Sequence, residues 1–117
     1  MPMIVHIADR ASWQSALKAG VYSAPSLQTE GFIHFSTPAQ VIRVANALYT
    51  GRPDLLLLVV DPADLAADLR YEAPVHEESE ELFPHLYGPL NLDAVTDVLP
   101  FPPRADGLFV LPLELTN

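Results

Sequence analysis

Six apolar residues in a row constrain the fold most strongly, because residues 55–60 read Leu-Leu-Leu-Leu-Val-Val without a polar side chain. A strand with one face in water alternates apolar and polar residues, so this run predicts a central strand covered on both faces. The run is far shorter than the ~20 residues that span a bilayer, and we expect no membrane partner. Half of the 117 residues are hydrophobic and only 18% are charged. This composition predicts one folded domain over residues 1–117.

Two amphipathic segments predict the main helices. In the first, Asp9 is placed to cap a helix that ends at Gly20. The second begins at Thr37-Pro38-Ala39-Gln40, which combines an N-cap residue, proline at the first helical position and glutamine three residues after the cap. We expect that helix to end at Gly51.

The remaining pattern predicts mostly strands. We expect a short helix over residues 61–69 and strands over residues 3–8, 32–35, 70–75, 95–101 and 108–113. The expected fold class is α+β, with a mixed, split β-sheet and two main helices.

The charge balance excludes several classes of function. Six Lys and Arg residues against fifteen Asp and Glu residues give a net charge of -9, which repels phosphates and makes nucleic acid an unlikely partner. The chain has no cysteine, so thiolate zinc sites, redox pairs and cysteine nucleophiles are excluded. The N-terminus lacks the basic and apolar segments of a signal peptide, so we expect a cytoplasmic protein.

Common ligand motifs are also missing. The five glycines are isolated, which excludes the glycine-rich phosphate loops of the Walker and dinucleotide-binding types. The stretch from His76 to His85 lacks the spacing that places two imidazoles on one helical face, and we expect no metal.

His34 is the first candidate for chemistry, because it lies in a short apolar strand just before a helix N-terminus. The strand end could direct His34 at a pocket while Ser36, Thr37 and Gln40 join the free helix amides in binding an anion. Alternatively, His34 is a structural residue bonded to backbone, and a capping box accounts for Thr37 and Gln40.

Three further residues are candidates. His85 and Tyr87 lie two residues apart in Phe83-Pro84-His85-Leu86-Tyr87-Gly88-Pro89, so in an extended segment both point to the same side and could form a ligand wall. The alternative is a rigid loop that covers the core. Glu72, between Tyr71 and Ala73 in an expected strand, is either a buried catalytic carboxylate or an ordinary exposed one.

These segments together resemble a known bacterial family, the domain of unknown function 952, over nearly the whole chain from Ile4 to Pro112. The resemblance rests on Gly31-Phe32-Ile33-His34-Phe35-Ser36-Thr37 and Phe83-Pro84-His85-Leu86-Tyr87, together with Trp13, Gly20-Val21-Tyr22, Gln40 and Leu69-Arg70-Tyr71-Glu72. That family is similar in fold to ADP-ribosyltransferases, including the tRNA 2′-phosphotransferases. The resemblance therefore implies an ADP-ribosyltransferase-like fold with an NAD-like ligand in a cleft of the split sheet.

The resemblance also implies roles for particular residues. His34 matches the strand histidine that holds a ribose hydroxyl, and Tyr87 is the candidate to stack on nicotinamide. Glu72 or His85 would be the late polar group that stabilises an oxocarbenium-like transition state. His6 matches the superfamily's first-strand histidine, but the family pattern does not require it and it stays outside the candidate set. The chain lacks the arginine cluster that holds an RNA 2′-phosphate, which argues against that substrate.

The leading hypothesis is an NAD-dependent, ADP-ribosyltransferase-like protein with NAD as its small nucleotide ligand and no metal. The alternative is a non-catalytic module that binds another small molecule or a protein, and the sequence indicates no particular protein partner. The acidic stretch of residues 77–81 is expected to border the cleft. The candidate catalytic residues are His34, Glu72 and His85, and the candidate ligand-binding residues are Ser36, Thr37, Gln40 and Tyr87.

Overall fold

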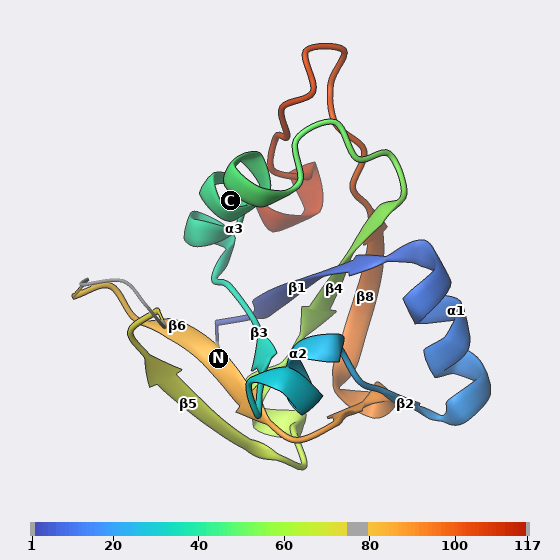
Figure 1. Cartoon of the computed structure of the whole chain (residues 1–117), viewed down its shortest axis with the longest axis vertical. Helices are drawn as coiled ribbons and strands as arrows, with labels where there is room; N and C mark the ends of the chain where they lie inside the picture. The colour runs from blue at the N-terminus through green and yellow to red at the C-terminus, as the bar shows by residue number, and fades with distance from the viewer. Residues whose placement is uncertain (1, 75–79, 117) are drawn as a thin grey trace.

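The central strand of the fold is β4 (Leu55–Val60), all of whose residues are buried. The structure is a computed structural model and describes residues 2–74 and 80–116. Strand β4 pairs antiparallel with β1 (Ile4–Asp9) on one side and with β8 (Val95–Pro100) on the other. The expectation of a central strand covered on both faces is therefore confirmed (Figure 1).

Alternate residues of β4 supply two separate hydrophobic clusters. Leu56, Leu58 and Val60 pack in the cluster that includes Trp13 of α1 (Arg10–Ala19). Leu55, Leu57 and Val59 pack in the other cluster, with α3 (Pro38–Leu48) and two phenylalanines from the C-terminal part of the chain. Because both faces of the strand are removed from water, a polar residue at any of its six positions would lose its hydration.

A second three-stranded sheet carries the candidate residues. It has the order β3-β6-β5, with β3 at Ile33–His34, β6 at Phe83–Tyr87 and β5 at Asp68–Glu72. Ile33 faces Leu86 across the pair and both join the core, whereas His34 faces His85 on the other side of the sheet. A third sheet consists only of β2 (Val21–Tyr22) and β7 (Leu90–Asn91).

The two larger sheets meet at a single bridge between Val5 and Ser36. The backbone amide of each residue donates to the carbonyl of the other, with both N···O distances at 2.8 Å. Since Ser36 lies just after β3 and just before α3, this bridge fixes where both elements sit against β1 (Figure 1).

Helix α1 forms with both expected end signals, whereas α3 begins as expected but ends at Leu48, with Tyr49 at its C-cap, and not at Gly51. The Asp9 side chain accepts from the Ser12 amide at the start of α1, and Gly20 ends that helix in the left-handed region at φ 82°. At the start of α3, Gln40 Oε1 accepts from the Thr37 amide at 3.0 Å. A further short helix, α2 (Pro25–Thr29), has proline in its first turn and is not among the helices expected from the sequence.

Three expectations need correction. Every strand pair among the described residues is antiparallel, so the sheets are not mixed. Residues 61–69 form only a 3-10 helix, Pro62–Asp64, before β5 begins, and a second, Leu92–Ala94, precedes β8.

The third correction concerns residues 108–113, which are not a strand. Phe109 stacks on Phe101 with ring centroids 4.7 Å apart, and its amide donates to Asn46 Oδ1 at 2.8 Å. The side chain of Asn46, on α3, thus accepts the hydrogen bond that a neighbouring strand would otherwise accept. A 3-10 helix, Leu113–Leu115, ends this segment. None of the helices formed by residues 2–74 and 80–116 has the length and apolarity needed to cross a membrane.

The double burial of β4 predicts the effect of truncating its side chains. We expect Leu57→Ala to lower the free energy of unfolding by about 2–5 kcal/mol, because Leu57 is fully buried and the variant leaves a cavity. Leu113→Ala is the matched control, since Leu113 is 85% exposed, and should change stability by less than ~0.5 kcal/mol. Urea denaturation measures both values, and equal losses would contradict the central position of β4.

Candidate functional site

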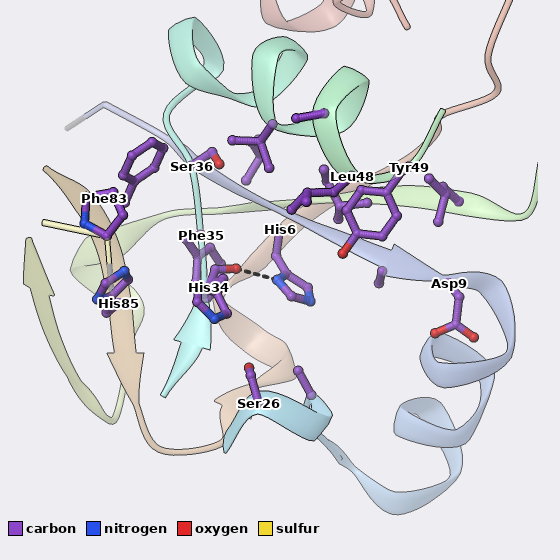
Figure 2. Close-up of a pocket in the computed structure, with 18 of the residues that line it drawn as sticks. His6, Asp9, Ser26, His34, Phe35, Ser36, Leu48, Tyr49, Phe83 and His85 are labelled. Carbon is purple, nitrogen blue, oxygen red and sulfur yellow. Dashed lines mark hydrogen bonds between the residues drawn. The ribbon is translucent and has the colours of Figure 1, made fainter. Parts of the chain in front are cut away.

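A cavity of about 810 Å³ opens where β1 meets the connection from β3 to α3. Its floor is the middle of β1, α3 contributes apolar residues that include Ala47 and Leu48, and α2 contributes Pro25 and Ser26. In Figure 2 the cavity extends from Phe83 and His85 at one end, past His34 and His6, to Tyr49 and Asp9 at the other. Its shape is therefore long, with aromatic rings at both ends.

His6 occupies the floor of this cavity with both ring nitrogens engaged. Its Nδ1 lies 2.6 Å from the His34 carbonyl oxygen and its Nε2 lies 2.8 Å from the Tyr22 hydroxyl. A carbonyl only accepts, so Nδ1 carries the proton and Nε2 accepts from the hydroxyl of Tyr22. Burial lowers the pKa of His6 to about 4 and raises the pKa of Tyr22 above its usual value. His6 is therefore neutral at physiological pH.

Our sequence reasoning left His6 out of the candidate set, although the structure places it at the centre of the cavity. The sequence feature that points to His6 is a single imidazole in a strand that is otherwise almost wholly apolar. Its partners Tyr22 and His34 are distant in sequence, so no local spacing indicated the contact.

His34 lines the cavity from β3 with its side chain about half exposed, at 52%. Its Nε2 lies 3.0 Å from Glu30 Oε2, and Glu30 also lines the cavity. The backbone of His34 orients His6 (dashed line in Figure 2), while its imidazole is left accessible.

His85 lies directly across the strand pair from His34, with ring centroids 5.6 Å apart, and it also lines the cavity. In contrast to His34, its side chain is only 3% exposed. The ring stacks on buried Phe32, with centroids 4.1 Å apart and planes 19° apart. Its Nδ1 lies 3.0 Å from Glu72 Oε1.

Glu72 and Tyr87 lie behind His85, outside the lining of the cavity. The Tyr87 hydroxyl donates to the same oxygen of Glu72 that His85 contacts, so His85 and Tyr87 do point to one side of β6. The Tyr87 hydroxyl, and after it His85, holds the pKa of Glu72 below its usual value, and the contact with Glu72 raises the pKa of Tyr87. The guanidinium of Arg70 lies 4.6 Å from the centre of the Tyr87 ring.

The structure brings only one of the three candidates at the start of α3 to the cavity. Ser36 is buried and lines it. The side chain of Gln40 binds protein groups instead, because Oε1 accepts from Thr37 and Nε2 donates to the Leu82 carbonyl at 2.8 Å and to Glu81 Oε2 at 3.1 Å. The capping interpretation therefore accounts for Thr37 and Gln40.

Both arginines that line the cavity are held in ion pairs. Arg43 forms an ion pair with Glu81, and both residues line the cavity. Arg52, at the other end, pairs with Asp54 at 3.0 Å. Glu81 thus places part of the acidic stretch at the cleft, whereas residues 77–79 and His76 lie outside the described residues. In the part of the chain that the structure describes, no group of three His, Cys, Asp or Glu residues is arranged to hold a metal ion.

Burial of neutral His6 predicts how stability depends on pH. In the unfolded chain His6 is protonated near its ordinary pKa of 6.5, whereas in the folded protein its pKa is about 4. The free energy of unfolding therefore falls as the pH drops from 6.5 towards 4. We expect a loss of about 2 kcal/mol from His6 between pH 7.5 and pH 5. Urea denaturation at both pH values measures it.

His6→Asn tests the assignment, because asparagine keeps a donor for the His34 carbonyl but does not titrate. The variant should lose the stated part of the pH dependence, whereas His34→Asn should keep it. An unchanged pH dependence in His6→Asn would show that another group is responsible.

The chain is similar to solved structures of one protein. The crystal structure of protein CC0527 from Caulobacter crescentus, a structural genomics target, is 33% identical in sequence and covers 97% of both chains with a TM-score of 0.85. The solution NMR structure of the same protein is 34% identical and covers 92% of this chain and 91% of that one, with a TM-score of 0.78. No curated protein matches the sequence.

A family model agrees with this similarity. The model described as a protein of unknown function (DUF952) matches residues 7–98, which include the last three residues of β1, the cavity residues of β3 and α3, and all of β6. The chain therefore belongs to the DUF952 family of proteins of unknown function.

Proposed function

We propose that the cavity binds NAD or a related nucleotide, on a fold similar to that of ADP-ribosyltransferases, and that the protein transfers ADP-ribose. The observation that carries the proposal is the shape and lining of the cavity, which has Phe83 and His85 at one end, Tyr49 at the other, and His34 and His6 between them. A dinucleotide has the matching order of groups, with a ring at each end and ribose hydroxyls and phosphates between them.

The size and chemistry of the cavity support this proposal. Its volume of about 810 Å³ falls within the roughly 300–1,000 Å³ of typical small-molecule sites. Arg43 and Arg52 line it near opposite ends, so one of the two could bind the diphosphate in place of its present carboxylate partner. The net charge of -9 does not oppose such a ligand, because these two cations are local to the site.

The proposal gives the three candidate catalytic residues a role and replaces the candidate for ring stacking. The accessible imidazole of His34 holds a ribose hydroxyl, and the Glu72–His85 pair stabilises positive charge that develops on the ribose. Phe83 and Tyr49 are better placed than Tyr87 to stack on the terminal rings, because they line the cavity while Tyr87 contacts Glu72 and Arg70.

Blocking the cavity tests whether it binds a nucleotide. Ala47→Phe adds a ring to an exposed position of α3 that lines the cavity, and we expect it to weaken binding of NAD and ADP-ribose by about tenfold or more in calorimetric titrations. Ala39→Phe makes the same change at an exposed position of α3 outside the lining and should leave the affinity within about twofold. Wild-type protein that gives no heat with either ligand at millimolar concentration would refute the proposal.

Turnover distinguishes an enzyme from a binding module. Incubation with NAD and a cell extract should release nicotinamide and add the mass of ADP-ribose to a target, both detected by mass spectrometry. His34→Ala should abolish both signals because the ribose loses its hydrogen-bond partner. Binding of NAD without release of nicotinamide would instead identify a non-catalytic binding module.

A further inference from the structure

We infer that Tyr87, Glu72 and His85 form a hydrogen-bonded relay that presents Nε2 of His85 to the cavity as a proton acceptor for a hydroxyl-bearing ligand or a water molecule. The relay is inferred from contacts within the chain. The kind of ligand that it would meet depends on the function proposed above.

The register between β5 and β6 brings the three residues of the relay within contact distance. Glu72 lies opposite Phe83, which places its carboxylate diagonally from His85, two residues along β6. One oxygen of Glu72 then reaches both His85 Nδ1, at 3.0 Å, and the Tyr87 hydroxyl. Because Tyr87 donates to Glu72, the carboxylate stays fixed although it is partly exposed.

The contact with Glu72 determines the tautomer of His85. An ionised carboxylate only accepts hydrogen bonds, so Nδ1 carries a proton, and in the neutral ring Nε2 is then the nitrogen with the lone pair. Within residues 2–74 and 80–116, the structure gives Nε2 no hydrogen-bond partner, although the side chain is almost completely buried. Stacking on Phe32 holds the plane of the ring.

This arrangement suits His85 to general base chemistry. When a ligand hydroxyl or water gives its proton to Nε2, the O–H bond breaks and the Nε2–H bond forms. The electron pair left on the oxygen forms a bond to C1′ of the NAD ribose, while the bond from that carbon to the nicotinamide nitrogen breaks and nicotinamide leaves with its electron pair. The imidazolium that results is balanced by the Glu72 carboxylate, whose depressed pKa keeps it ionised. Glu72 and Tyr87 are then positioning residues, and His85 is the residue that meets the ligand.

Long-range proton–nitrogen NMR of the imidazole rings tests the relay without any ligand. In the neutral form of the ring in the wild-type protein we expect His85 to show a protonated Nδ1 and an unprotonated Nε2. Glu72→Gln should shift the population toward the opposite tautomer, because its amide can donate to Nδ1. Tyr87→Phe should move the same nitrogen signals in the same direction by a smaller amount.

Asp68→Asn is the matched control. It removes one carboxylate from the same strand, and Asp68 pairs with Arg70 rather than with His85. It should leave the His85 nitrogen signals unchanged, and backbone amide spectra check that each variant is folded. A protonated Nε2 in the wild-type protein, or equal shifts in Asp68→Asn and Glu72→Gln, would overturn the inference. Since no ligand is present, failure of NAD to bind would refute the proposed function and leave the relay standing.

Discussion

Strand β4 has no face in water, and the position of the candidate site depends on this constraint. Its alternate residues fill two hydrophobic clusters, so β1 and β8 must pair with its two edges and α3 must cover one of its faces. On β1 this arrangement places His6 opposite fully buried Leu58. A buried imidazole needs partners for both nitrogens, and it finds them in the Tyr22 hydroxyl and the His34 carbonyl. Burial of β4 thus leads to contacts that join β2 and β3 to the floor of the cavity.

The three histidines of the cavity differ because their surroundings differ. His6 is buried and uses both ring nitrogens within the protein, so it supports the site without a nitrogen left for a ligand. His85 is equally buried but uses only Nδ1 among its contacts with the described residues. His34 is half exposed, and among the described residues the hydrogen-bond partner of its ring is Glu30, which a ligand would replace under the proposed function. We therefore assign the three histidines different tasks. His6 supports the framework of the site, His85 is the inferred proton acceptor, and His34 is the proposed contact for the ligand.

The sequence predicted what depends on local pattern. Absence of alternation identified β4, the Thr37 to Gln40 signature placed the start of α3, and two-residue spacing put His85 and Tyr87 on one side of β6. It could not show that Glu72 binds both of them, because that contact depends on the register between β5 and β6.

The role of His6 was missed for a related reason, since its partners are 16 and 28 residues away. Residues 108–113 show the opposite error. Their apolar pattern is typical of a strand, but the backbone amide of Phe109 donates to the side chain of Asn46 on α3 and not to a neighbouring strand.

The central claim is that the histidine-lined cavity between β1, β3 and α3 is the ligand site. A crystal structure of the protein with bound ADP-ribose tests it most directly. The account predicts density for the ligand along the cavity, with a ribose hydroxyl in contact with His34 and a hydroxyl or water within hydrogen-bonding distance of His85 Nε2. An empty cavity at saturating ligand, or ligand bound at another face of the molecule, would contradict it.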